Sequence, residues 1–292
     1  MDASAMNGER APLCLLGLIG KGIQASKSPV IHETEAAAQG FRCSYELLDL
    51  DTYGDRRELL SELLLGAEQR GFAGLNITYP CKQAVIPMLH ELSDEARVIG
   101  AVNTVRFSDG RRIGFNTDAW GFAESIRRGL PGASLTRVVQ LGAGGAGAAT
   151  AHALLELGVQ TLIVIDTDTT RAETLTRRLA DHFADRVIMA RSDLERGLAN
   201  ADGVVNATPM GMSAHPGSAV PKELLRPELW VADIVYFPLE TQLLRDARAA
   251  GCHTLDGGGM AVFQAARAFE IFTGRKADGE RMRRHFATLS RA

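Results

Sequence analysis

The chain contains little cysteine and few aromatic residues. It has 4 cysteines among 292 residues, and aromatic side chains make up 6%. Cys14, Cys43, Cys81 and Cys252 lie far apart, without a Cys-x-x-Cys pair and without a nearby histidine at metal-ligand spacing. We therefore expect reduced thiols, as in a cytoplasmic protein, and neither disulfides nor a metal site.

An excess of charge and a long apolar run are also lacking. The net charge is -3 and the isoelectric point is about 6.2, so nucleic acid and anionic membranes are not expected partners. No apolar run approaches the ~20 residues that span a bilayer. Met1–Arg10 is polar and contains acids, which predicts no targeting segment. With 46% hydrophobic residues, the chain is long enough for two globular domains.

What the sequence does contain is a glycine loop between two apolar runs. The loop reads Gly142-Ala143-Gly144-Gly145-Ala146-Gly147, and an alanine-rich helical segment and the apolar run Thr161–Ile165 follow it. Gly142 allows a tight turn, Gly144 lets the backbone approach a pyrophosphate, and Gly147 lets a helix pack against a strand. Strand, loop, helix and strand in this order predict a dinucleotide-binding unit.

Asp166 closes the second apolar run, roughly 20 residues after the glycines. A carboxylate there accepts hydrogen bonds from the adenosine ribose hydroxyls, which favours NAD over NADP. Helices at 171–183 and 240–250 and strands at 186–190, 203–206 and 229–236 continue the pattern. Together they predict a doubly wound sheet.

A separate α/β unit precedes this motif. We expect strands at 13–19, 45–50 and 74–77, and helices at 29–39, 56–67, 80–92 and 119–128. The last helices, at 260–272 and 279–289, are left over and are expected to pack on this first unit. The sequence thus predicts an α/β protein with a substrate domain, 1–119 plus 258–292, and a Rossmann dinucleotide domain, 120–257. The active site is expected between them.

Lys82 and Asp118 are the candidates for chemistry. Lys82 falls in the first turn of the expected helix 80–92, where a cation opposes the helix dipole at a cost of ~0.3–1 kcal/mol. A solvated surface lysine tolerates that cost, so the position admits either a surface residue or a group held for proton transfer. Asp118, near the expected domain boundary, either caps the helix that follows or takes part in catalysis.

Four further polar residues stand where packing does not explain them. Ser28 has the alternative of a helix N-cap, but Ser26 does not, and the two hydroxyls together suit a carboxylate. Asn103 interrupts an apolar, β-branched run, although asparagine is depleted in strands. Gln264 lies on an apolar helix face, where an unpaired amide costs ~1–3 kcal/mol, so a ligand or a buried partner must satisfy it.

The order of these motifs resembles the shikimate dehydrogenase family along nearly the whole chain. The motifs that carry the resemblance are Ser26-x-Ser28-Pro29, Asn76-Ile77-Thr78-x-Pro80-x-Lys82, Ile99–Val105, Asn116-Thr117-Asp118, Gly142–Ala146, Asn206–Met212, Asp233–Tyr236, and Gly257–Met260 with Gln264. Motifs from both expected domains occur in family order and spacing.

The resemblance implies hydride transfer between a nicotinamide and a ring carbon that bears a hydroxyl. The reaction interconverts shikimate and 3-dehydroshikimate, or quinate and 3-dehydroquinate. Lys82 would exchange the hydroxyl proton, and Asp118 would orient both the hydroxyl and the lysine. The implied substrate ligands are Ser26 and Ser28 for the carboxylate, and Thr78, Asn103, Tyr236 and Gln264 for the ring hydroxyls or the carboxylate edge. The implied cofactor ligands are Gly142, Gly144, Gly145, Ala146, Gly147, Asp166, Arg171, Thr208, Ile234, Gly257 and Met260.

Departures from the family pattern bear on the cofactor and the substrate. NADP-using members typically carry Asn-Arg-Thr where this chain has Asp166-Thr167-Asp168, and two acids near a phosphate are unfavourable. We expect NAD, with NADP weaker because Arg171 is retained. Gly20–Ala25 lacks the His-Ser of biosynthetic members, and Ala119 follows Asp118 where a glycine is usual, both as in the quinate/shikimate branch. Ser28 is the shikimate-type residue, so the preferred substrate stays open.

Other functions remain open at this stage. A dehydrogenase for an amino-substituted analogue of shikimate fits the same pocket, and a non-catalytic nucleotide-binding relative would keep the fold. A short-chain dehydrogenase is disfavoured because the chain has no Tyr-x-x-x-Lys pair. We expect a monomer or a homodimer.

Overall fold

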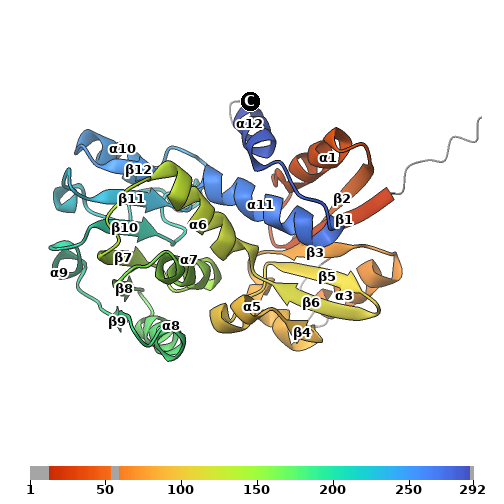
Figure 1. Cartoon of the computed structure of the whole chain (residues 1–292), viewed down its shortest axis with the longest axis horizontal. Coiled ribbons are helices and arrows are strands. Elements are labelled where there is room, and N and C mark those ends of the chain that lie inside the picture. The colour runs from red at the N-terminus through yellow and green to blue at the C-terminus, as the bar shows by residue number, and fades with distance from the viewer. Residues whose placement is uncertain (1–12, 54–58, 290–292) are drawn as a thin grey trace, which may run out of the picture.

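The computed structural model describes residues 13–53 and 59–289, which form two six-stranded sheets connected by long helices (Figure 1). The expected α/β class is confirmed. The first residues of the expected helix 56–67 and all of Met1–Arg10 lie outside the described residues. Within the described part of the chain, no helix is long and apolar enough to cross a membrane.

The first sheet is mixed, in the order β2-β1-β3-β5-β6-β4. Strands β1, β2 and β3 are parallel, while β5 is antiparallel to both β3 and β6. Its strands are β1 (Leu13–Gly20), β2 (Arg42–Asp49), β3 (Gly74–Ile77), β4 (Glu91–Leu92), β5 (Thr104–Ser108) and β6 (Arg111–Phe115). Its helices are α1 (Ser28–Ala38), α2 (Leu50–Tyr53), α3 (Leu59–Gln69), α4 (Cys81–Ala84) and α5 (Asp94–Ile99).

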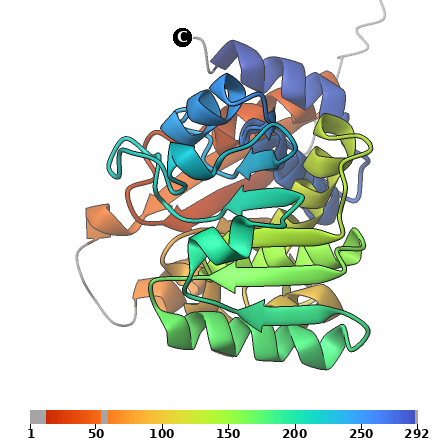
Figure 2. The ribbon, with the colours of Figure 1, turned by 90° about the vertical axis from the view of Figure 1, so that its left-hand side faces the viewer.

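The second sheet is entirely parallel, in the order β12-β11-β10-β7-β8-β9, which is the doubly wound order of a Rossmann fold (Figure 2). Val138, Leu162 and Val204 on its central strands are fully buried, as expected for a parallel sheet covered on both faces. Its strands are β7 (Arg137–Leu141), β8 (Thr161–Ile165), β9 (Val187–Ala190), β10 (Gly203–Asn206), β11 (Trp230–Asp233) and β12 (His253–Leu255). Its helices are α7 (Gly145–Glu156), α8 (Thr169–His182), α9 (Leu194–Leu198) and α10 (Gln242–Ala249).

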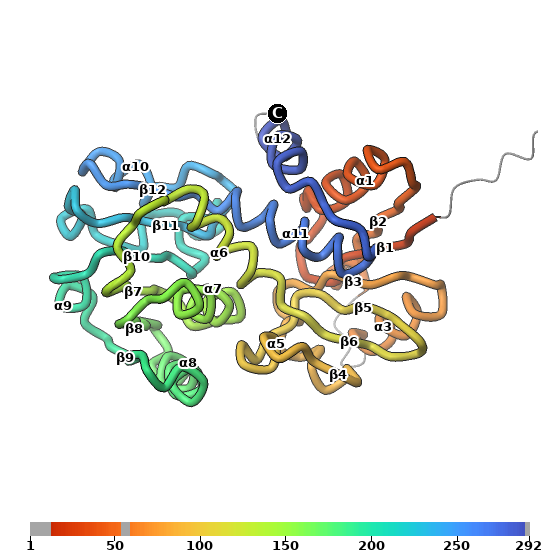
Figure 3. Tube along the Cα trace, in the orientation of Figure 1, coloured from red at the N-terminus to blue at the C-terminus, as the bar shows by residue number. Residues whose placement is uncertain are grey.

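Helices α6 (Thr117–Gly129) and α11 (Gly258–Thr273) pack against each other and run between the two sheets (Figure 3). Their close approach depends on small residues, because a Cβ on Gly121 would lie 2.6 Å from the backbone nitrogen of Gln264. Helix α12 (Gly279–Leu289) then packs beside α1, where Arg281 pairs with the fully buried Glu35 at 2.7 Å. The C-terminal segment therefore returns to the first sheet.

Two local predictions are wrong. The expected helix 80–92 is only the short α4, followed by a 3-10 turn at Ile86–Met88 and strand β4, because Pro87 cannot continue an α-helix. The apolar run Ile99–Val105 is not one strand: α5 ends at Ile99, and β5 begins at Thr104 as the first arm of a hairpin. Asn103 thus precedes the strand.

Candidate active site

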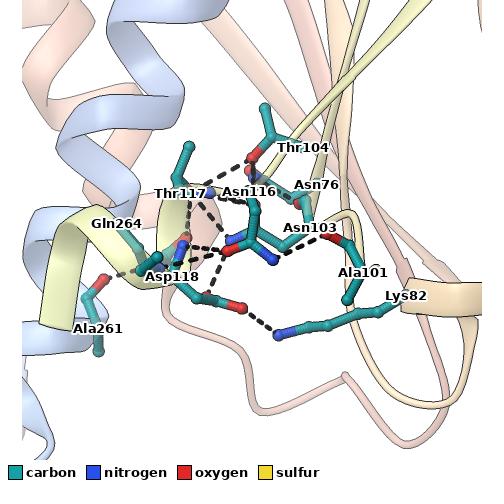
Figure 4. A network of polar contacts seen from close by, with 11 residues as sticks. Asn76, Lys82, Ala101, Asn103, Thr104, Asn116, Thr117, Asp118, Ala261 and Gln264 are labelled. Atoms are coloured by element: carbon teal, nitrogen blue, oxygen red, sulfur yellow. Dashed lines mark hydrogen bonds and ion pairs between the residues drawn. The ribbon is translucent and has the colours of Figure 1, made fainter. Parts of the chain in front are cut away.

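Lys82 and Asp118 form an ion pair at the ends of the first-sheet strands. Lys82 lies on α4, directly after β3, and Asp118 lies in the first turn of α6, directly after β6. Lys82 Nζ is 2.5 Å from Asp118 Oδ2, and the two side chains are 18% and 9% exposed (Figure 4). The amine is therefore held by a largely buried carboxylate while part of its side chain stays open to solvent.

Asp118 does not cap its helix. Asn116 does so, because its Oδ1 accepts hydrogen bonds from the backbone nitrogens of Asp118 and Ala119. The second carboxylate oxygen of Asp118 accepts a 2.8 Å hydrogen bond from Asn103 Nδ2. Asp118 is consequently free to bind Lys82 with one oxygen while the other is anchored.

The side-chain amide of Asn103 makes its hydrogen bonds with other protein groups. Its Nδ2 donates to Thr117 Oγ1 and to Asp118, and its Oδ1 accepts from the backbone nitrogen of Thr117 at 2.7 Å. Asn76 lies beside it, donating to Thr104 Oγ1 and accepting from the Tyr45 hydroxyl. We did not expect Asn76 as a site residue, although a buried asparagine in a strand was a usable signal.

Gln264 connects α11 to this network. Its Nε2 donates to the carbonyl of Ala261 at 3.0 Å, and its Oε1 accepts from Thr117 Oγ1 at 3.4 Å. The side chain is half-buried and points to the same cluster as Asp118 (Figure 4). The buried partner that the sequence required is therefore Thr117.

Ser26 and Ser28 lie together, half-buried, at the start of α1, of which Ser28 is the first residue. The Ser26 hydroxyl donates to Ser28 Oγ at 3.2 Å and accepts from the backbone nitrogen of Ser28. The N-cap position falls on Lys27, so Ser28 is not the cap. Burial raises the pKa of the Tyr45 phenol, and a hydrogen bond with Ser28 opposes this rise, which places Ser28 beside Tyr45. Tyr45 thus connects the serine pair to Asn76 through hydrogen bonds.

Tyr236 approaches the pair from the second sheet. Although 53% of its surface is exposed, enclosure of its phenol by protein raises the pKa of Tyr236, with Lys82 opposing and Asp118 adding to that rise. Its hydroxyl is therefore within electrostatic range of both. Thr78 directly follows β3, and its methyl group packs so closely on Gly20 that a Cβ on that glycine would collide with it.

The glycine loop has the geometry of a dinucleotide site. Gly142 has a φ of +98°, and a Cβ on it would lie 2.6 Å from the carbonyl oxygen of Ala207. A Cβ on Gly147 would collide with the carbonyl of Gly142, while Gly144 faces open space. Helix α7 begins here without a side-chain cap and without an acid in its first turn, so its amides fit a pyrophosphate. Gly145 and Ala146 carry two of those amides.

Gln140, which we did not expect, supports this loop from the buried side. Its Nε2 donates to the carbonyls of Gly142 and Gly147 at 2.9 and 2.7 Å, and its Oε1 accepts from Thr150. The side chain is fully buried. A glutamine in an otherwise apolar central strand was the available signal, since a buried amide needs hydrogen-bond partners.

The acids after β8 hydrogen-bond to the glycine loop and to the start of α8. Asp166 Oδ2 accepts from the backbone nitrogen of Ala143 at 2.7 Å, so this carboxylate also fastens the glycine loop. Asp168 caps α8 by accepting from the nitrogen of Arg171, and its Oδ2 lies 3.5 Å from the Arg171 guanidinium. The retained arginine is thus partly neutralised by the neighbouring acid.

The remaining expected cofactor residues follow β10, β11 and β12. Thr208 donates to Asn206 Oδ1 at 2.6 Å, and Asn206 in turn donates to the buried Asp233, whose pKa is raised by burial. Ile234 follows Asp233, and its carbonyl packs so closely on Gly257 that a Cβ there would collide. The Met260 side chain, 8% exposed, belongs mainly to the core between α6 and α11.

Lys82 lies beside the start of α7. A Cβ built on Gly145 would lie 3.6 and 3.7 Å from Cδ and Cβ of Lys82, in ordinary van der Waals contact. The lysine stem therefore lies close to the first residue of α7 while its amine binds Asp118. The ion pair is thus near the glycine loop.

Comparison with known proteins agrees with this geometry. Residues 18–105 match the shikimate dehydrogenase substrate binding domain, and residues 257–285 match the shikimate 5'-dehydrogenase C-terminal domain. The chain is 57% identical to a shikimate dehydrogenase (NADP(+)) of Streptomyces avermitilis, over 94% of this chain and 96% of that protein. It is 50% identical to a quinate/shikimate dehydrogenase (NAD(+)) of Corynebacterium efficiens, over 94% and 98%.

A solved structure is similarly close. The quinate dehydrogenase from Corynebacterium glutamicum in complex with NAD superposes with a TM-score of 0.88 and 48% identity, covering 94% of this chain and 99% of that one. Fold, site and relatives together define an NAD(P)-dependent oxidoreductase. The chain belongs to the shikimate dehydrogenase family, which confirms the resemblance seen in the sequence.

Proposed function

We propose that this chain catalyses the reversible NAD-dependent oxidation of shikimate to 3-dehydroshikimate, of quinate to 3-dehydroquinate, or of both. The observation that supports this most directly is the Lys82–Asp118 pair, whose lysine stem lies close to the start of α7. In this proposal, residues 1–119 and 258–292 bind the substrate and residues 120–257 bind the cofactor. The named activities of the relatives from Streptomyces and Corynebacterium support the same chemistry.

Lys82 carries the proton in the proposed mechanism. A nicotinamide held at the glycine loop would supply the two-electron chemistry, as the acceptor of a hydride. In its deprotonated form, the Lys82 amine accepts the hydroxyl proton as the carbonyl forms, and the resulting ammonium returns it to the carbonyl oxygen in the reverse direction. Asp118 fixes the amine through Oδ2, because its other oxygen is held by Asn103. The proton and the hydride together account for the two hydrogens lost.

The other polar residues place the substrate ring. We assign the carboxylate to the hydroxyls of Ser26 and Ser28, which lie 3.2 Å apart. Thr78, Tyr236 and Gln264 are assigned to the ring hydroxyls. Asn103 differs, because its amide hydrogens are already used on Thr117 and Asp118, so a contact with substrate requires that one of these bonds be exchanged. Its first role is to position Asp118.

The cofactor preference rests on charge. Relatives named for NADP and for NAD both share about half or more of their residues with this chain, so identity alone does not decide. Asp166 and Asp168 lie where a 2'-phosphate would bring charge near -2, and the guanidinium of Arg171 is already 3.5 Å from Asp168. NAD is therefore the proposed cofactor, with NADP weaker.

A matrix of substrates and cofactors tests the proposal. Shikimate, quinate and an amino analogue of shikimate are each assayed with NAD and NADP, from neutral to alkaline pH, by nicotinamide absorbance. We expect turnover with shikimate or quinate and a higher kcat/KM with NAD. No turnover with either acid would refute the activity, and a higher kcat/KM with NADP would refute only the cofactor preference. A Lys82→Met preparation controls for host enzymes.

A further inference from the structure

Two neighbouring helices of the second sheet carry metal-ligating side chains that the proposed function does not use. His152 and Glu156 lie one turn apart on α7, and His182 ends α8. One ligand atom from each of the three lies within 4.8 Å of the other two. The His-x-x-x-Glu spacing places the first two side chains on one helix face, and the third comes from another element.

The sheet topology explains why α7 and α8 meet here. Strands β7, β8 and β9 are adjacent and parallel, and the two helices are the successive crossovers between them. Because such crossovers are right-handed, both helices cover the same face of the sheet. The rings of His152 and His182 face each other at 6.2 Å between centroids and 28° between planes. Phe183 packs edge-on against both rings.

His152 has an unused nitrogen in a buried position. The residue is 4% exposed, and within the described part of the chain its Nδ1 has no hydrogen-bond partner. A neutral imidazole ring offers the lone pair of one nitrogen. Neutral imidazole is the form that binds metals. Glu156 and His182 are exposed, so solvent reaches the group from one side.

We propose that His152, Glu156 and His182 bind a divalent transition-metal ion of the zinc type. Two imidazole nitrogens and one carboxylate oxygen are a donor set that Zn²⁺ accepts, with water in the fourth tetrahedral position. Ligand distances of about 2.0–2.2 Å require the three atoms to draw closer, which the exposed side chains of Glu156 and His182 can do by rotation. Cysteine spacing predicted no metal site. Spacing along the chain does not show that His182 of α8 lies beside His152 and Glu156 of α7.

Binding would join the second half of α7 to the end of α8. The glycine loop lies at the opposite end of α7, at Gly144–Gly147. We therefore expect the ion to stabilise the fold, since a ligand that binds only the native state raises the free energy of unfolding. We do not expect it to be required for turnover.

The test titrates Zn²⁺ alone into the full chain after chelator treatment, followed by calorimetry and by thermal unfolding. Glu156→Gln and His182→Asn remove ligands at exposed positions. His253→Asn is the matched control, because His253 is an exposed histidine on β12. Cys14→Ser with Cys43→Ser is a second control, because these residues are neighbours on β1 and β2 and thiols bind zinc.

We expect one Zn²⁺ per chain and a rise in Tm. Each ligand variant should weaken binding by about ten-fold or more and reduce the rise in Tm, while both controls behave as wild type. Absence of saturable binding, or equal affinity in the wild type and both ligand variants, would overturn the site. Loss of binding in the cysteine control would assign the ion to the thiols and would also overturn it.

Discussion

Replacing Lys82 with methionine tests whether its amine moves the proton. The lysine stem contacts the position of a Gly145 Cβ at 3.6–3.7 Å, and methionine keeps most of that stem. Cofactor affinity should therefore be retained. General acid–base groups contribute ~10²–10⁴-fold, so we expect kcat to fall by at least ~10²-fold, which corresponds to about 2.7 kcal/mol of transition-state stabilisation. Initial rates in both directions and NAD titration measure the two effects.

The same variant has a stability cost that must be separated from catalysis. It leaves the Asp118 carboxylate, 9% exposed, without its cation. Breaking a fully buried pair costs about 3–5 kcal/mol, and we expect less here because the lysine remains partly open to solvent. Rates are therefore compared well below the Tm of the variant. Turnover within about ten-fold of wild type would refute the assigned role.

Asp118→Asn completes the test. The asparagine amide can accept a hydrogen bond from Asn103 only if its oxygen faces Asn103 and its NH₂ group faces Lys82. Two hydrogen-bond donors, the NH₂ group and the lysine amine, would then face each other. We expect a loss of similar size, and a double variant with Lys82→Met no worse than the poorer single variant, because the two residues act as a unit. Multiplicative losses would show that they act independently, contrary to the mechanism.

Three other changes probe the cofactor loop and the buried charges. Asp166→Asn with Thr167→Arg should shift the kcat/KM ratio toward NADP by about ten-fold or more, and an unchanged ratio would speak against Asp166 as the discriminating residue. Gly147→Ala should lower both Tm and NAD affinity because its Cβ collides with the loop, whereas Gly144→Ala, which faces open space, should lower NAD affinity alone; equal Tm losses would contradict this. Burial raises the pKa of Glu95 to about 7 from 4.5, so its contribution to stability is present at low pH and declines as pH rises through 7. Glu95→Gln should therefore stabilise the protein by about 1–3 kcal/mol near pH 8 and much less near pH 5 in urea unfolding, and an equal effect at both would refute the cause.

The glycine loop could be predicted closely because local backbone geometry requires a glycine at these positions, and this is the demand that the sequence pattern shows. Gly142 needs a positive φ, and Gly147 has no space for a side chain. Neither demand depends on distant residues. Support from Gln140 is different, since its partners are fixed only when β7 and α7 are folded together.

Helix starts and ends were less predictable where neighbouring residues compete. Asn116 and Asp118 are both good caps, and only the folded backbone gives that role to Asn116. The expected helix 80–92 failed at Pro87, a breaker that outweighed the apolar periodicity. The β5–β6 hairpin had a usable signal in Asp109-Gly110, whose φ values of 52° and 68° suit a tight turn.

The arrangement around Asn103 explains how the Asp118 carboxylate keeps its orientation. Asn103 is 2% exposed and uses its amide on Thr117 and Asp118, so both ends of the group are fixed before substrate arrives. A preorganised carboxylate needs no reorganisation during the reaction. Although α6 also packs against α7, Asp118 is bound to two residues of the first sheet, Lys82 and Asn103. If the two sheets move relative to each other, the ion pair therefore moves with the substrate side, and the distance to the cofactor side is what changes.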